Sequence, residues 1–264
     1  MADVALITIH GMGRIKPDYF RDLEDGLVKI LGRRNWDRVA FRNVQYASVL
    51  QGPQDELWAA MLAEGANELD ARKTREFFLF GFGDGGSLEY SAQKDPRRYI
   101  AVQKKIQEEL LSAFAAMDYI AEKPVVIIAQ SLGCQVISNY LWDAQYGRHI
   151  FAGAGSAPRA DFLKLKSLRN LITTGCNIPL FVGGLGDRVC FAPPHLEFTW
   201  DNYYDKDDVL GWPLRQLGRT YEVVNDRAIK VGGVLTSWNL ASHTGYWSDK
   251  AVIAAVAARI LQRL

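Results

Sequence analysis

The sequence has almost no excess of charge of either sign. Its 264 residues carry 31 Lys and Arg against 30 Asp and Glu, which leaves a formal net charge of +1. Proteins that bind nucleic acid or an anionic membrane surface through bulk charge carry a basic excess or a basic patch. No cluster of Lys and Arg interleaved with aromatic residues is present in the sequence. We therefore expect no nucleic acid among the partners, and no recruitment to an anionic membrane surface by charge.

Cysteine is scarce, and its spacing does not indicate a metal site. Cys134, Cys176 and Cys190 are too few to pair completely, and neither a CxxC motif nor a zinc-like Cys/His spacing occurs. Reduced thiols in a reducing compartment fit this pattern. No G-x-G-x-x-G follows an expected strand, so a dinucleotide-binding fold is not indicated. We expect no metal and no other cofactor.

Long hydrophobic runs are missing too. No stretch reaches the roughly 18 consecutive apolar residues that a membrane-spanning helix requires. The first apolar run, Val4–Ile9, is short and lacks the charged start of a signal peptide. We therefore expect a cytoplasmic protein with no integral membrane segment. Because 48% of the residues are hydrophobic, the chain can bury a large core without disulfides, and we expect a single domain over residues 1–264.

What the sequence does contain is an alternation of short apolar runs with stretches of helical period. Such an alternation predicts an α/β fold with a mostly parallel sheet and helices on both faces. We expect a hairpin near the end, because Asn225-Asp226 separates two short apolar runs. The expected strands are Val4–Ile9, Arg38–Ala47, Pro124–Ala129, Leu171–Gly175, His195–Tyr203 and the hairpin pair Glu222–Val224 and Ala228–Val231.

The segment from Gln51 to Arg97 fits the alternating pattern poorly. It contains residues that suit a helix and a dense aromatic run, Phe77–Phe82. An insertion of this length is typical of a lid over a functional site. A surface excursion packed by its own aromatic side chains is an equally good interpretation.

The strongest motif is Ile-Ile-Ala-Gln-Ser-Leu-Gly, in which a buried strand leads directly into Ser131 and a helix follows at once. Small residues at Ala129 and Gly133 allow a sharp strand-to-helix turn that exposes a serine hydroxyl at the edge of a sheet. The start of the new helix favours developing negative charge. We therefore predict that Ser131 is a nucleophile.

A second motif, His10-Gly11-Met12-Gly13, follows the first strand. A segment of this type provides a backbone N–H that pairs with the N–H after the nucleophile to bind an oxyanion. The predicted donors are the amides of Met12 and Leu132. We expect His10 to brace this turn rather than to transfer protons.

Together with a late histidine in Ala-Ser-His-Thr-Gly-Tyr-Trp, these motifs resemble the α/β-hydrolase superfamily, close to its bacterial lipase- and esterase-like members. The resemblance covers nearly the whole chain except residues 51–97. It implies a catalytic triad in the chain order Ser, acid, His. His243 lies in a loop just before the terminal helix, where this superfamily has its general base, whereas His149 and His195 lie elsewhere.

Three carboxylates compete for the position of the triad acid. In lipase-like relatives an Asp precedes a short apolar pair in the loop after the appropriate strand, and Asp207 matches that spacing best. Asp208 is the second choice and Asp187 the third. Clusters of acids in turns are usually solvated, so all three remain candidates.

The resemblance implies hydrolysis of a small-molecule carboxylic ester through an acyl-enzyme intermediate. The same triad also serves thioesterases, amidases and acyltransferases. A protein that binds a ligand or partner on a hydrolase scaffold without turnover is the alternative outside enzymes.

Overall fold

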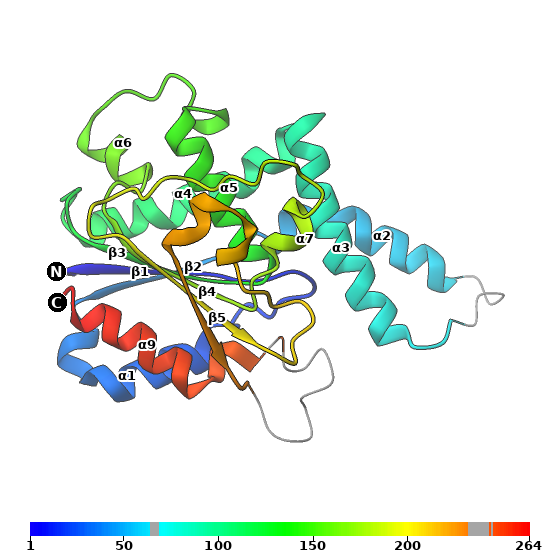
Figure 1. The fold of residues 1–264 in the computed structure, drawn as a ribbon, viewed down its shortest axis with the longest axis horizontal. Helices are drawn as coiled ribbons and strands as arrows, with labels where there is room; N and C mark the ends of the chain where they lie inside the picture. The colour runs from blue at the N-terminus through cyan, green and yellow to red at the C-terminus, as the bar shows by residue number, and fades with distance from the viewer. Residues whose placement is uncertain (64–68, 232–242, 244) are drawn as a thin grey trace.

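A computed structural model describes residues 1–63, 69–231, 243 and 245–264 of the chain. Among these residues lies a six-stranded sheet with the strand order β2-β1-β3-β4-β5-β6, in which every neighbouring pair is parallel (Figure 1). The predicted α/β class with a parallel central sheet is thus confirmed. The strands are β1 Val4–Ile9, β2 Val39–Val44, β3 Val125–Gln130, β4 Leu168–Thr174, β5 Thr199–Asp205 and β6 Val224–Ile229.

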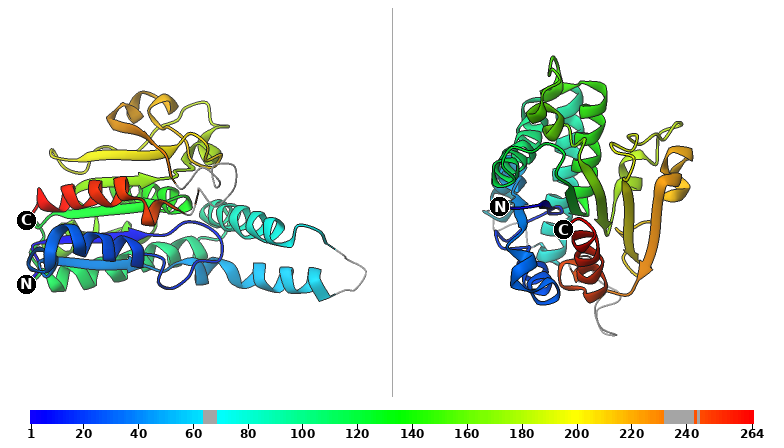
Figure 2. Two further views of the ribbon diagram at one scale, coloured as in Figure 1. Left: turned by 90° about the horizontal axis from the view of Figure 1, so that it is seen from below. Right: turned by 90° about the vertical axis from the view of Figure 1, so that its left-hand side faces the viewer.

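Helices cover both faces of this sheet. The helices α1 (Arg21–Trp36) and α9 (Lys250–Leu261) lie together on one face, and α4 (Arg97–Ala116) and α5 (Leu132–Tyr146) lie on the other (Figure 2). Successive strand residues point to opposite faces, so Val4 and Leu6 pack with α1 and α9 while Ala5 and Ile7 pack with the opposite layer. Burial on both faces explains why the central strands β1 and β3 are almost wholly apolar.

Local signals set the ends of several helices. The Asp249 side chain accepts hydrogen bonds from the amides of Ala251 and Val252 and so caps the start of α9. Gly147, with a φ of 62°, ends α5 in the left-handed conformation that glycine adopts easily. The short helices are α6 (Pro158–Leu163) and α7 (Ile178–Val182), and the 3-10 turns are η1 (His149–Phe151), η2 (Arg215–Leu217), η3 (Arg219–Val223) and η4 (Gly245–Ser248).

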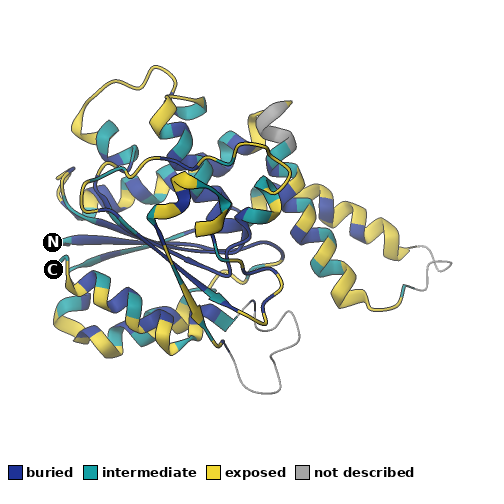
Figure 3. Cartoon of the chain, in the orientation of Figure 1, coloured by how far each residue is buried: buried dark blue, intermediate teal, exposed yellow. Residues whose placement is uncertain are grey.

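The segment that interrupts the sequence pattern forms two long helices, α2 (Ala47–Ala63) and α3 (Arg72–Gln93). They pack on each other as a helical hairpin that extends away from the sheet (Figures 1 and 2). Much of the surface of the hairpin is exposed, including Phe78 and Phe82 of the aromatic run (Figure 3). In the part of the chain with a described structure, no helix combines the length and the apolarity that crossing a membrane requires.

The predicted hairpin at Asn225-Asp226 is wrong. Both residues lie inside β6, which runs parallel to β5 along its full length. Two polar residues between apolar runs resemble a turn in the sequence, but Asp226 is polar because of a tertiary contact. Its carboxylate accepts hydrogen bonds from the amides of Leu214 and Arg215 and from Asn202 Nδ2. Asp226 therefore fastens the loop between β5 and η2 to the sheet.

The strand order creates a switch point between β1 and β3. The chain leaves β1 toward β2 on one side, and β3 pairs with β1 on the other. In open parallel sheets, ligands bind outside the carboxyl ends of the strands at such a point. His10-Gly11-Met12-Gly13 follows β1 and Ser131 follows β3, so both motifs lie at this position.

Asp226 holds a loop and its neighbour Asn225 is exposed, so substitution of the two residues should have different effects on stability. We expect Asp226→Ala to lower the free energy of unfolding by about 2 kcal/mol, because three donors lose a charged acceptor. The exposed neighbour Asn225 serves as the control, and Asn225→Ala should change stability by less than about 0.5 kcal/mol. Urea unfolding of the two variants measures both values, and equal losses would contradict the role of Asp226 in holding the loop.

Candidate active site

Ser131 occupies a strained turn between β3 and α5. Its φ of 51° and ψ of −123° lie in a region that residues with a side chain rarely adopt. The Ser131 amide donates to Thr174 O at the end of β4, at 3.0 Å, which holds the turn against the sheet. A sharp strand-to-helix turn of this kind directs a serine hydroxyl away from the strand.

The turn at Ser131 lies directly against the end of β1. A Cβ atom at Gly133 would lie 2.4 Å from His10 O and 2.7 Å from Ile9 O, so only glycine fits there. A Cβ atom at Gly11 would lie 2.9 Å from Ser131 Cβ. The glycines of the two sequence motifs therefore allow the loop after β1 and the serine turn to touch.

His243 lies beside Ser131, as the sequence predicted. Ser131 Oγ donates to His243 Nε2 at 2.7 Å, and His243 Nδ1 donates to Asp208 Oδ2 at 2.8 Å. Ser131 and His243 are only 1% and 3% exposed, so this hydrogen-bonded chain is shielded from bulk water. A neutral histidine with Nδ1–H on a carboxylate leaves Nε2 as an acceptor, which is the tautomer that a general base requires.

Asp207, the first choice for the acid, does not contact His243. The side chain of Asp207 is exposed, and its amide donates to Asp205 Oδ1 at 2.9 Å. Its neighbour Asp208 is buried instead, and it takes the position on His243. Asp187 lies elsewhere, in the loop after α7. The carboxylate partner of His243 is thus corrected from Asp207 to Asp208, the second choice.

Asp208 stays ionised although it is buried. Burial raises the pKa of this carboxyl, but the hydrogen bond and charge of His243 act in the opposite direction. Tyr246 OH donates to Asp208 Oδ2 at 2.9 Å and the Leu210 amide to Oδ1 at 3.0 Å. The net pKa lies below the usual value, because the donors outweigh the loss of solvent.

Gln130 is a site residue that the sequence analysis missed. Its Nε2 donates to the backbone carbonyl of His243, and its Oε1 accepts from Trp247 Nε1 at 2.5 Å. Gln130, the residue before Ser131, therefore holds the backbone of His243 in place. No sequence signal pointed to it, because the contact spans 113 residues of chain.

The predicted oxyanion donors flank the same turn. Leu132 is the first residue of α5, and Met12 follows Gly11, which lies against Ser131. Within the described residues, neither the Met12 amide nor the Leu132 amide has a hydrogen-bond acceptor. Free amides at a helix start beside a nucleophile can receive a negatively charged oxygen.

His10 orients the loop that carries Met12. Its Nε2 accepts from the Tyr46 amide at 3.2 Å, so the proton is on Nδ1, which donates to Gly11 O at 2.8 Å. Tyr46 OH donates to the same carbonyl at 3.0 Å. Because the C=O and N–H of a trans peptide point in opposite directions, fixing Gly11 O also fixes the direction of the Met12 N–H. His10 braces the turn in this structure, as expected.

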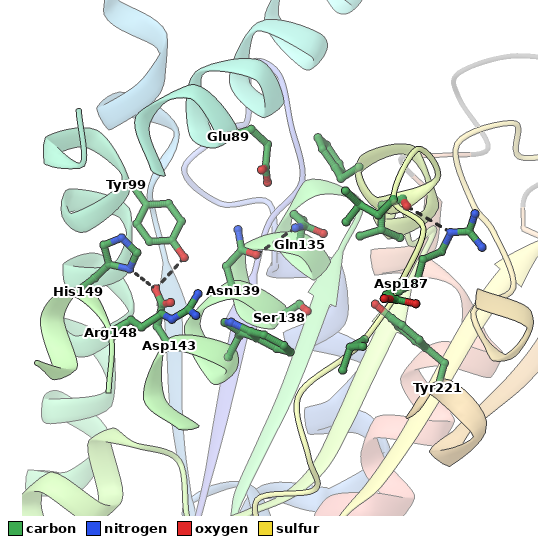
Figure 4. A pocket seen from close by; sticks show the side chains of 16 residues that line it. Glu89, Tyr99, Gln135, Ser138, Asn139, Asp143, Arg148, His149, Asp187 and Tyr221 are labelled. Carbon is green, nitrogen blue, oxygen red and sulfur yellow. Dashed lines mark hydrogen bonds and ion pairs between the residues drawn. The ribbon is translucent and has the colours of Figure 1, made fainter. Parts of the chain in front are cut away.

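A pocket of about 500 Å³ opens beside α5, one helical turn beyond the serine. Gln135 and Asn139 of α5 and Glu89 of α3 form one wall, and Asp187 and Tyr221 lie on the opposite side (Figure 4). Burial raises the pKa of Glu89, while hydrogen bonds from Gln135 and Asn139 partly offset this. His149 also lines the pocket and donates from Nδ1 to Asp143.

Among the residues described by the structure, no group of three or more His, Cys, Asp or Glu side chains is arranged to hold a metal ion. Comparison of the sequence with models of known protein families found no match, and a search of curated proteins found no similar protein.

The burial of His10 predicts a pH dependence of stability. Burial lowers the pKa of His10 from 6.5 to about 4, so the unfolded chain binds the proton more tightly. Stability therefore falls as the pH drops from about 6.5 toward 4. Between pH 7 and pH 5 we expect His10 to account for a loss of about 2 kcal/mol. In His10→Asn, unfolding measured at both pH values should show a difference smaller by that amount; an unchanged difference would refute the assignment.

Substitution of the two neighbouring aspartates should affect the reactivity of Ser131 very differently. Asp208→Asn should slow reaction with a fluorophosphonate by about 10³-fold or more, because the histidine loses the partner that holds its tautomer. Asp207→Asn should leave the rate within about twofold, because an exposed carboxylate without contact to His243 contributes little. Mass spectrometry of the labelled protein over time gives both rates. A slow Asp207→Asn beside a normal Asp208→Asn would reverse the correction.

Proposed function

We propose that this protein is a serine hydrolase of the α/β-hydrolase type that cleaves carboxylic esters. The observation that carries the proposal is the continuous chain from Ser131 Oγ through both ring nitrogens of His243 to Asp208. Nucleophile, base and acid are each within hydrogen-bond distance of the next, which is the geometric criterion for this class of site. The elbow geometry at the carboxyl end of β3 gives further support.

The proposed reaction begins when Ser131 Oγ attacks the ester carbonyl. His243 Nε2 takes the hydroxyl proton, and Asp208 stabilises the resulting imidazolium. The carbonyl oxygen becomes an oxyanion that the amides of Met12 and Leu132 bind. Collapse of this intermediate expels the alcohol, which receives the proton from His243 and leaves an acyl group on Ser131. Water then attacks the acyl-enzyme by the same steps and releases the carboxylic acid.

The burial of the site favours catalysis over inert binding. Ionised Asp208 is held by three donors, His243, Tyr246 and the Leu210 amide. A buried charge of this kind costs free energy unless it is fully paired. The strained Ser131 adds a further cost. A scaffold that only binds a ligand gains nothing from either feature. Thioesters and amides remain alternatives, since the same groups act on all three carbonyl classes.

The proposal is tested by hydrolysis of p-nitrophenyl esters from acetyl to long-chain, with a thioester and an anilide in parallel. We expect turnover of esters by the wild type and a loss of at least about 10⁴-fold in Ser131→Ala. Ser138→Ala is the matched control, because Ser138 lies on the same helix and lines the neighbouring pocket. It should keep its ester activity.

Preference for the thioester or the anilide would shift the assignment to those classes. If no substrate is hydrolysed and a fluorophosphonate does not modify Ser131, the enzyme assignment is wrong and a binding role replaces it.

A further inference from the structure

The helical hairpin α2–α3 is fastened to the loop that carries the oxyanion donor. Asp84 of α3 is 1% exposed, and its Oδ2 accepts a hydrogen bond from the Gly13 amide at 3.0 Å. Two residues of α2 hold the same carboxylate: Gln54 Nε2 donates to Oδ1 at 2.9 Å and Gln51 Nε2 to Oδ2 at 3.3 Å. Gln51 Nε2 also donates to Gly13 O at 2.5 Å. Both polar groups of Gly13 are therefore bound by the hairpin.

The residues on either side of Gly13 contact the hairpin as well. The Met12 side chain lies against α3, where a Cβ atom at Gly81 would be 2.7 Å from its Sδ. Arg14 forms ion pairs with Asp55 of α2 at 2.8 Å and with Glu76 of α3 at 2.7 Å. Its guanidinium also stacks over Phe80, 4.7 Å from the ring centre. Three consecutive loop residues, Met12, Gly13 and Arg14, are thus held by the α2–α3 hairpin, which extends away from the sheet.

These contacts complete the restraint on Met12. The peptide before Met12 is fixed through Gly11 O by His10 and Tyr46. The peptide after it is fixed through the Gly13 amide by Asp84. With both flanking peptides held, the Met12 N–H cannot reorient without breaking these hydrogen bonds. Preorganised donors stabilise an oxyanion because they need not reorient during the reaction.

We propose that the α2–α3 hairpin serves to position the loop of residues 12–14, called the oxyanion loop here, and that Asp84 is the positioning residue that couples the hairpin to this loop. The inference rests on the proposed hydrolase function and assigns to α2 and α3 a role in transition-state stabilisation. Asp84 acts through Gly13 and does not itself contact the reacting atoms.

The burial of a carboxyl group at position 84 supports a positioning role for Asp84. Burial raises the pKa of this carboxyl, although hydrogen bonds from Gly13, Gln54 and Gln51 oppose the change. An apolar side chain would pack there without that penalty. A carboxylate offers two oxygens that accept from the loop and from α2 together, which no apolar residue does.

Asp84→Ala and Asp84→Asn separate positioning from simple packing. Asparagine keeps one oxygen for the Gly13 amide, and its new Nδ2–H faces Gln54. The Gln54 Oε1 has no partner within the described residues, so rotation of that amide satisfies the new donor. We expect Asp84→Ala to lower kcat for p-nitrophenyl ester hydrolysis about 10- to 100-fold with KM changed less than about threefold. Asp84→Asn should stay within about threefold of the wild type.

Asp201→Ala controls for a general loss of stability. Asp201 is also buried and joins separate elements through Arg227 and Arg259, but it shares no hydrogen bond with the oxyanion loop. Asp201→Ala should lower Tm with kcat nearly unchanged.

A boronic acid, which forms a tetrahedral adduct with Ser131, should bind Asp84→Ala about 10-fold or more weakly than the wild type.

Hydrogen exchange at the Gly13 amide tests the contact without any turnover. Exchange should be at least about 10-fold faster in Asp84→Ala and close to wild type in Asp84→Asn. Wild-type kcat in Asp84→Ala, or an equal loss in both Asp84 variants, would overturn the inference. So would a loss in Asp84→Ala no larger than in Asp201→Ala. If the wild type hydrolyses nothing, the exchange result still decides whether the hairpin holds the loop, and the failure lies with the proposed function.

Discussion

The arrangement of the site depends on one close approach, that of the start of α5 to the end of β1. Gly133 lies where any side chain would collide with the carbonyls of Ile9 and His10. Because β1 and β3 are parallel neighbours in register, the chain leaves both strands at the same edge of the sheet. The close approach then places Gly11 against Ser131, so the proposed nucleophile and the predicted oxyanion donors lie close together.

Around this contact, buried polar groups are held by several partners each. Asp208 is paired with His243, Tyr246 and the Leu210 amide, and Asp84 with Gly13, Gln51 and Gln54. Unpaired, either carboxylate would be costly in a protein interior. Burial acts to raise the pKa of both carboxyls. The net pKa of Asp208 is lowered and that of Asp84 is raised, because His243 supplies charge to Asp208 that the amides around Asp84 lack.

The two histidines of the site differ in what their nitrogens face. His10 has both nitrogens bound to backbone groups, and its burial makes protonation unfavourable. His243 has a carboxylate on one nitrogen and a hydroxyl on the other. An adjacent carboxylate stabilises an imidazolium, whereas a backbone amide donor excludes one. The proposed division of labour, a structural His10 and a proton-transferring His243, follows from these neighbours.

The sequence by itself determined the α/β class, the strands β1 and β3, and Ser131 at a strand-to-helix turn, because hydrophobic periodicity and small residues act over a few positions of chain. Packing decided the rest. Asp208 rather than Asp207 meets His243 because a one-residue difference in a turn reverses the direction of a side chain. Asn225-Asp226 lies in a strand because its partners come from a distant loop. The contacts of Gln130 and Asp84 span 113 and 71 residues, and only the folded chain brings such positions together.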